Sequence, residues 1–282
     1  AVPADAAGAC AINSEAWIAR RDGVFALRDG EPGTVLEQIA AAPAGTHLTA
    51  MGRARDGGCW LGTNAGLFHL TVGTDGSAVA TPAMPLPEEW IESLHADREG
   101  DLWVGTVDGG LIQLRQGRFS VYTIEDGLPH NFVAAVFEDS QRNLWLGTNA
   151  GLSRLTDGVI TTVPFPQGRP DTGSIAEDRA GNLWFSANGQ LHQFRNGRFT
   201  RWTAAQGLPH EPVRELLGDR AGNLWLGSLG HGLTRLSKGS FCNFGPHDGL
   251  ADSEVTALYE SRTGTIWVGF RNGGISRFDA TT

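Results

Sequence analysis

The sequence predicts an all-β protein made of seven similar units, and three observations lead to this prediction. A tryptophan recurs seven times, at spacings of 43, 43, 42, 39, 41 and 42 residues. Short apolar runs around each tryptophan alternate with turns rich in Asn, Asp and Gly, which is typical of antiparallel strands. Four such strands in a repeat of about 40–45 residues form one blade of a β-propeller. We therefore expect one seven-bladed propeller over residues 1–282, with blades centred on Trp17, Trp60, Trp103, Trp145, Trp184, Trp225 and Trp267.

The fourth repeat shows the expected elements of one blade. We expect its strands at 133–137, 144–148, 152–155 and 159–163. The intervening turns contain Asn and Gly, which accept positive φ at little cost. The turn Asp178–Asn182 and its equivalents lack the alternating ligands and terminal Glu of a calcium loop. We therefore predict no metal site, and expect each Asp to accept backbone N–H bonds in its own turn.

The repeat tryptophan and a nearby glycine are expected to join neighbouring blades. A single blade cannot bury both of its faces, so blades must stack around a ring. A bulky indole in each blade suits the wedge between two sheets. The glycine two residues later, such as Gly147, leaves room for the next sheet to approach closely.

The two ends of the sequence decide how the ring closes. In the first blade we expect an inner strand near 9–12, then strands at 16–20, 24–27 and 35–39. Outer strands carry an aromatic pair, namely Phe119/Tyr122, Phe199/Trp202 and Phe241/Phe244. The same pair in the seventh blade would fall near or past Thr282, so the last blade is expected to lack a full outer strand. Residues 1–7 are few and contain Pro3, so we expect closure mainly by face packing of blades one and seven.

Composition limits the classes of partner. Hydrophobic residues make up 40% and charged residues 19% of the chain, and the net charge is −9. An acidic chain without a basic stripe disfavours a nucleic-acid partner, and no apolar run is long enough for this fragment to enter a membrane. The start at Ala1 without a Met indicates a processed product or an excised fragment. Cys10, Cys59 and Cys242 lack metal-like spacing, and three separate buried thiols are favoured over one disulfide.

A composite motif connects the chain to a known family. The pattern Asp-Gly-Leu-Pro, Glu-Asp-x-x-Gly-Asn-Leu-Trp-Leu-Gly-Thr, Gly-Leu-x-Arg-Leu, Gly-x-Phe and Tyr/Trp-Thr is nearly complete over 117–155 and again over 197–236. It resembles the two-component-regulator propeller repeat. In that family such propellers are the sensory parts of membrane-bound histidine kinases, hybrid regulators or diguanylate cyclases. The resemblance implies a periplasmic, or otherwise extracytoplasmic, ligand-sensing piece of a bacterial membrane regulator.

One face of the propeller is the expected place for ligands. The turn from each outer strand to the next inner strand shares this face with the turn between the second and third strands, around a central funnel. The residue types at these positions differ from repeat to repeat, whereas the flanking Asp-Gly-Leu-Pro and Val positions recur in several repeats. This contrast is consistent either with unconstrained solvent loops or with a binding surface. Trp90 is suited to stacking on a sugar ring or to capping its strand. The candidate ligand-binding residues are Asn64, Glu89, Trp90, Asp108, His130, Asn131, Phe132, Asn149, Arg169, His210, Glu211, His231, Asp252 and Arg271.

The inner strands supply two columns of residues near the axis. The column expected to face the axis is Thr49, Glu92, Ala134, Gly173, Arg214 and Thr256. The next column is Ala50, Ser93, Ala135, Ser174, Glu215 and Ala257. Small residues suit seven crowded strands, and the exceptions Glu92, Arg214 and Glu215 suggest an ion pair in a structural or water-filled channel.

Two other functions compete with sensing. No nucleophile, phosphate-loop or zinc-protease motif is present, so we do not expect an enzyme. If the chain is one, His130, His210 and Glu211 are the candidate acid–base residues of a lyase or hydrolase for a small cyclic or carbohydrate substrate. A passive interaction scaffold is the third reading. We expect no cofactor, a small-molecule or oligosaccharide ligand, and a second propeller or a second copy of the chain as the candidate protein partner.

Overall fold

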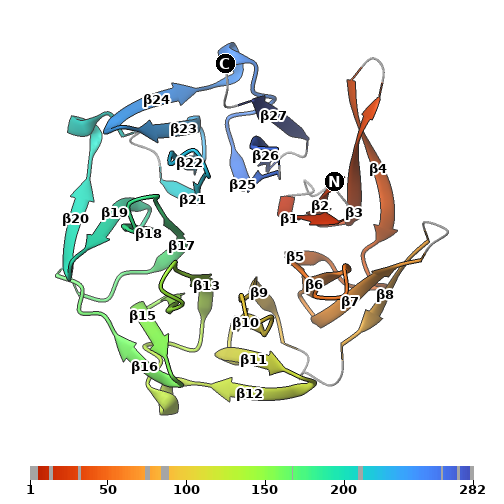
Figure 1. Cartoon of the computed structure of the whole chain (residues 1–282), viewed down its shortest axis with the longest axis horizontal. Coiled ribbons are helices and arrows are strands. Elements are labelled where there is room, and N and C mark those ends of the chain that lie inside the picture. Colours follow the sequence, from red (N-terminus) through yellow and green to blue (C-terminus); the bar gives the residue numbers. More distant parts are fainter. Residues whose placement is uncertain are drawn as a thin grey trace.

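Seven antiparallel sheets stand around a central axis in the computed structural model of the chain (Figure 1). The structure describes residues 6–12, 15–30, 33–73, 77–83, 89–166, 168–208, 212–261, 263–271 and 274–279. Each sheet begins with its innermost strand and ends with its outermost strand, so sequence order equals radial order. The predicted seven-bladed propeller is confirmed.

The strands occupy the positions that the repeat predicts, with small differences at their ends. Blades one and two contain β1 Ala6–Ile12, β2 Glu15–Arg20, β3 Gly23–Gly30, β4 Gly33–Ala41, β5 Leu48–Arg53, β6 Cys59–Thr63, β7 Gly66–Val72 and β8 Ala78–Pro82. Blades three and four contain β9 Ile91–Ala96, β10 Leu102–Thr106, β11 Leu111–Arg115, β12 Arg118–Tyr122, β13 Val133–Glu138, β14 Leu144–Thr148, β15 Gly151–Thr156 and β16 Val159–Thr162. Blades five to seven contain β17 Thr172–Glu177, β18 Leu183–Ala187, β19 Gln190–Arg195, β20 Arg198–Trp202, β21 Val213–Gly218, β22 Leu224–Ser228, β23 Gly232–Ser237, β24 Ser240–Phe244, β25 Val255–Glu260, β26 Thr265–Phe270 and β27 Ile275–Asp279.

Three short 3-10 turns connect outer strands to the next inner strands. They are η1 Ile124–Asp126, η2 Ala204–Gln206 and η3 Pro246–Asp248. In η1 the Thr123 side chain accepts from the backbone of Glu125, and Asp126 Oδ2 accepts from the Thr123 N–H at 2.8 Å. The turn ends at Gly127, whose φ of 101° suits a residue without Cβ. No helix among the described residues is long and apolar enough to cross a bilayer.

The ends of the chain fit the predicted closure in part. The last sheet has three strands, as expected, so β27 is its outer edge. The inner strand of blade one begins at Ala6, not near residue 9, and residues 1–5 lie outside the described part. Blades one and seven meet through Ile18 and Trp267, which are buried in one apolar cluster. Face packing of the two blades therefore closes the ring, as predicted.

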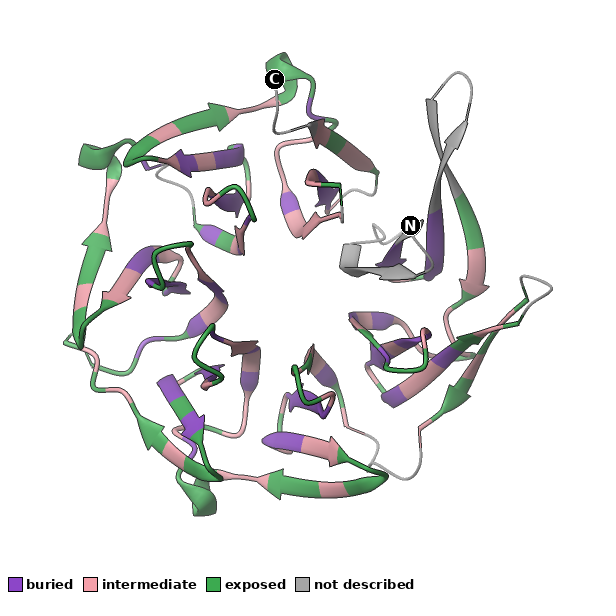
Figure 2. Ribbon diagram, in the orientation of Figure 1, coloured by how far each residue is buried: buried purple, intermediate pink, exposed green. Residues whose placement is uncertain are grey.

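The core lies between blades and not within them, and Figure 2 shows exposed residues along the outer strands. The second strands are the most buried: every residue of β10, β14, β18 and β22 is buried. Every repeat tryptophan belongs to a cluster shared with the following blade. The seven clusters pair Trp17 with Leu61, Trp60 with Ile91, Trp103 with Val133, Trp145 with Ile175, Trp184 with Val213, Trp225 with Val255, and Trp267 with Ile18. The predicted wedge role of the tryptophans is confirmed.

In five of the seven blades a glycine lies two residues after the tryptophan, and in blades two, three, four and six it marks a close approach of two blades. Blades one and five have Ala19 and Ser186 at this position. A Cβ added at Gly147 would lie 2.7 Å from the carbonyl oxygen of Thr172 in the next blade. A Cβ at Gly62 would lie 2.7 Å from Cγ2 of Ile91, again in the next blade. Real Cβ atoms do not approach other atoms this closely, so any larger residue there would push the blades apart.

An aspartate six residues before the tryptophan holds the indole in place. Asp139 is 5% exposed, and its Oδ2 accepts the Trp145 Nε1–H at 2.7 Å. The same carboxylate accepts the backbone N–H groups of Gln141 and Asn143 and the Asn143 side-chain amide, at 2.8–2.9 Å. The equivalent indole bonds join Trp103 to Asp97 (2.8 Å), Trp184 to Asp178 (2.8 Å) and Trp225 to Asp219 (2.7 Å). The expected turn role of Asp is confirmed, and the indole bond adds a second role.

A glutamate seven residues before the repeat tryptophan connects two blades in three places; it precedes the aspartate in two of them and Ser261 in the third. Its carboxylate accepts a backbone N–H from the corresponding turn of the preceding blade. The donor and acceptor pairs are Arg98 and Glu138 (2.9 Å), Ser140 and Glu177 (2.7 Å), and Arg220 and Glu260 (3.1 Å). In blades four and five the Glu-Asp dipeptide therefore fixes both the tryptophan of its own blade and the turn of the preceding blade.

The prediction of three separate buried thiols is wrong. Cys59, the first residue of β6, is disulfide-bonded, and its side chain is completely buried. Cys242 is a free thiol and is exposed on the outer strand β24. The sequence spacing carried no sign of the bridge, because a propeller brings together residues of different blades that are far apart in the chain.

Asp139→Ala is expected to destabilise the protein by about 3 kcal/mol or more. The change leaves the buried Trp145 indole and three further donors without their acceptor, and a hydrogen bond to a charged group contributes about 1.5–3 kcal/mol. Urea unfolding followed by tryptophan fluorescence measures the loss. Glu125→Ala, a change of an exposed carboxylate, is the matched control. An equal effect of both substitutions would contradict the role of Asp139.

Candidate functional site

Buried threonines close the turns between second and third strands in blades two, three and four. In blade four, buried Thr148 ends β14, and its Oγ1 donates to the Gly151 carbonyl at 2.9 Å. The same hydroxyl oxygen accepts the Ala150 N–H at 3.2 Å. Thr63 and Thr106 close their own turns with bonds of 2.8 and 2.9 Å. The Gly-Thr of the motif therefore fixes the turn and leaves its tip residue free to vary.

The structure places the predicted ligand-binding residues on these tips and on the linkers to the inner strands. Six are exposed, namely Trp90, Asp108, His130, Asn149, Arg169 and His231. Six are partly buried, namely Asn64, Glu89, Asn131, Phe132, Asp252 and Arg271. His210 and Glu211 lie outside the described residues, so the proposed group of His130, His210 and Glu211 has one described member.

Several of these side chains are used by the loops themselves. Asn64 Oδ1 accepts the His47 N–H at 2.7 Å, which ties a turn of blade two to the linker before it. Asn131 Oδ1 accepts the Ile124 N–H at 3.0 Å, and His130 Nδ1 accepts the Phe132 N–H at 2.8 Å. Such bonds assign a structural role to positions that the sequence suggested were free of the fold's demands.

Trp90 remains available for contact with a partner molecule. It is 45% exposed, although it lies in the linker just before β9. Its ring meets the His47 ring edge to face, with centroids 5.4 Å apart. This contact orients the indole and leaves much of its surface open for stacking.

Each inner strand carries a bulge at its start, which the sequence did not reveal. In blade four Val133 pairs with Thr148 and Ala135 pairs with Gly147, so Ala134 has no partner. All seven blades show the same irregularity at this register. The residues left unpaired are Ala7, Thr49, Glu92, Ala134, Gly173 with Ser174, Arg214 and Thr256. A bulge redirects side chains, and here two consecutive residues of most inner strands line the channel.

The central channel contains a cavity of about 370 Å³. Along the inner strands its lining changes from polar to apolar. The first layer is Thr49, Glu92, Ala134, Arg214 and Thr256, joined by Arg271 from the turn after β26. The second layer lines the cavity as predicted and consists of Ala50, Ser93, Ala135, Ser174, Glu215 and Ala257. The third layer is Met51, Leu94, Val136, Ile175 and Leu258.

The charged residues of the cavity do not neutralise one another directly. Among the described residues, Arg214, Glu92 and Glu215 form no ion pair, so the suggested pairing is not present. Arg271 lies near Glu254, with Nη1 and Oε2 3.9 Å apart. Burial raises the pKa of Glu215 to about 7; the Arg214 charge opposes this shift and the Glu92 charge adds to it. Burial also raises the pKa of Glu92, again opposed by Arg214.

Glu215→Gln is expected to change how stability depends on pH. The folded state holds the Glu215 proton more tightly than the unfolded state, so the stability of the wild type falls as pH rises from about 4.5 to about 7. Glutamine does not titrate, so the free energy of unfolding of the variant should rise by on the order of 2 kcal/mol relative to that of the wild type between pH 5 and pH 8. Urea unfolding at both pH values measures this gain, with Glu125→Gln as an exposed control. A stability difference between variant and wild type that does not vary with pH would contradict a raised pKa of Glu215.

Comparisons with known proteins agree with the repeat and the ring. The sequence model of the two component regulator propeller family matches residues 85–108, 127–150 and 249–272. No curated protein matches the chain. The fold is similar to the extracellular domains of two proteins described as hybrid two component systems of B. thetaiotaomicron, BT4673 and BT3049. Each is 19% identical, with TM-scores of 0.82 and 0.80 over 99% and 100% of this chain.

The chain spans 38% and 40% of the lengths of those two structures. A catalytically inactive virginiamycin B lyase from Staphylococcus aureus, solved with quinupristin, is 16% identical, with a TM-score of 0.77 over 98% of this chain and 95% of its own. At these identities the structural likeness supports the fold alone. Three segments of the chain therefore match the two component regulator propeller repeat, and the chain folds as a seven-bladed ring.

Proposed function

We propose that this chain is the extracytoplasmic ligand-sensing domain of a bacterial membrane regulator of the two-component type. The observation that carries the proposal is the match of three blades to the two component regulator propeller model. Similarity to extracellular domains of two such systems supports it. The output region would be a histidine kinase, a hybrid regulator or a diguanylate cyclase.

The disulfide at Cys59 supports an extracytoplasmic, and in a Gram-negative bacterium a periplasmic, location. Disulfides form and persist in oxidising compartments such as the periplasm, and are rare in the bacterial cytosol. The chain also exposes a free thiol at Cys242, which allows its location to be tested directly.

Sensing requires a ligand that distinguishes two arrangements of the receptor. The funnel face offers variable polar tips, an exposed indole at Trp90 and a cavity in the channel below. A small molecule or an oligosaccharide bound there, or a propeller–propeller contact at the same face, would favour one arrangement of a dimer. This surface is the proposed sensing site.

A lyase activity is the weaker alternative. Its support is the fold shared with virginiamycin B lyase, and a fold does not carry a function by itself. His130 Nδ1 is occupied by a backbone N–H, so only Nε2 would be free for proton transfer. His130→Ala tests the lyase alternative: loss of turnover with binding retained would favour a lyase, and no turnover by the wild type would remove it.

Labelling of Cys242 in intact cells tests the proposed location. A small membrane-impermeant maleimide should modify the exposed thiol before lysis if the propeller lies outside the cytoplasm. Cys242→Ser is the matched control and should remain unlabelled. Labelling that occurs only after lysis would contradict the location.

A thermal-shift screen of the 282-residue chain tests the sensing function itself. A ligand at a hundred times its dissociation constant adds about 2.7 kcal/mol to stability. We expect at least one small molecule to raise the melting temperature. Trp90→Ala would weaken a ligand that stacks on the funnel face, and Trp202→Ala on the outer strand β20 would not. The absence of any stabilising compound in a broad library would count against sensing.

A further inference from the structure

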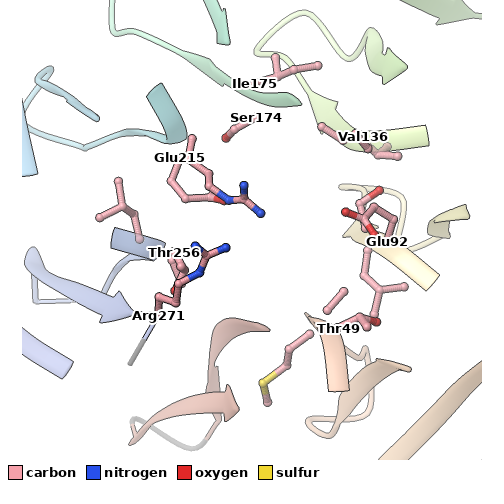
Figure 3. Close-up of a pocket in the computed structure, with 17 residues that line it drawn as sticks. Thr49, Glu92, Val136, Ser174, Ile175, Glu215, Thr256 and Arg271 are labelled. Carbon is pink, nitrogen blue, oxygen red and sulfur yellow. The ribbon is translucent and has the colours of Figure 1, made fainter. Parts of the chain in front are cut away.

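The channel mouth contains charges of both signs, and among the described residues Arg214, Glu92 and Glu215 form no ion pair. Arg271 and Glu92 point into the cavity from opposite walls (Figure 3). Arg214 lies in the bulge of β21, next to Glu215, and all four side chains line the same cavity. Because all seven blades carry a bulge here, the fold itself does not require charged side chains: the equivalent position in blade four is Ala134.

These charges are compensated only in part: Arg214 opposes the rise in the pKa of Glu92 and Glu215, and Arg271 lies 3.9 Å from Glu254. Arginine stays charged at any physiological pH, whereas burial raises the pKa of both Glu92 and Glu215. The hydroxyls Thr49 Oγ1 and Thr256 Oγ1 are buried without a hydrogen-bond partner. Buried hydroxyls without partners are costly. A ligand that brings charges of both signs would relieve this cost.

We propose that the channel mouth binds a small zwitterion, whose carboxylate meets Arg214 and Arg271 and whose ammonium group meets Glu92. This inference rests on the proposed sensing function and names its ligand class. Two guanidinium groups suit a carboxylate, because each offers several N–H donors to its oxygens. The ammonium group has an anionic partner on the opposite wall.

The cavity disfavours the other small ligands. A simple anion would face the two glutamates without a group to neutralise them. A volume of about 370 Å³ is at the small end of the range for ligand pockets and favours a small molecule in the channel itself. The apolar third layer, which includes Met51, Leu94 and Leu258, suits a short methylene chain between the two charged ends.

Isothermal titration of the 282-residue chain with linear ω-amino acids tests this inference. The probes are glycine, β-alanine, 4-aminobutyrate and 6-aminohexanoate, with butyrate and butylamine as ligands that carry one charge. We expect one length to bind best, and both single-charge ligands to bind at least tenfold more weakly. Arg214→Gln and Glu92→Gln should each weaken the best ligand at least tenfold. Arg201→Gln, an exposed arginine on β20, should leave it unchanged.

Three results would overturn the inference. They are no binding by any ω-amino acid at millimolar concentration, equal binding of butyrate or butylamine, and unchanged affinity in the Arg214 and Glu92 variants. Arg271→Gln, in a turn outside the inner strands, provides a second test if a strand variant fails to fold. A library ligand that stabilises the wild type and both strand variants equally would overturn the channel site and leave the sensing function intact.

Discussion

In blades three to six the fold depends on a hydrogen bond between a buried or half-buried aspartate and the indole N–H of the repeat tryptophan. The aspartate orders its own turn through backbone N–H groups and at the same time sets the position of the ring that fills the next interface. A tryptophan free to rotate would leave a gap between blades, and cores do not tolerate such gaps cheaply. Local turn geometry and packing between blades are therefore coupled at one carboxylate.

Variation among the blades supports this view. Blade two has Ala54 in place of the aspartate, and its Trp60 is only partly buried, with its ring 4.5 Å from the His69 ring. Blade seven has Ser261, whose Oγ accepts the Thr265 N–H at 3.1 Å and so orders the turn without a carboxylate. These two blades adjoin blade one, the place where the ring closes. The most regular hydrogen bonding lies in blades three to six.

Much of this arrangement could be predicted from the sequence, because strands, turns and close contacts between blades each require particular residue types that recur in most repeats. The period and the turn residues identify the strands, and the glycine after the tryptophan identifies the close approach of blades. The missing outer strand of blade seven followed from the position of the aromatic pair relative to Thr282. The disulfide at Cys59 could not be predicted, because it depends on which side chains of different strands meet in space.

The site was harder to predict than the fold. Variable positions on the funnel face suggested ligand contacts, yet Asn64, Asn131 and His130 hold the loops together. Their short-range hydrogen bonds depend on loop geometry that no periodicity encodes. The two columns near the axis were identified, but not the bulge that turns both of them into the channel. The bulge is a backbone feature and leaves no residue signature at positions as different as Thr49 and Arg214.

Hydrogen exchange of the indole N–H groups, followed by NMR, tests most directly whether the aspartate of each turn holds the tryptophan between two blades. Trp103, Trp145, Trp184 and Trp225 donate to buried or half-buried aspartates, so their indole signals should exchange much more slowly than that of exposed Trp90. Asp139→Ala should accelerate exchange at Trp145 more than at Trp225, whose partner is Asp219. Exchange at the four repeat tryptophans as fast as at Trp90 would contradict the account.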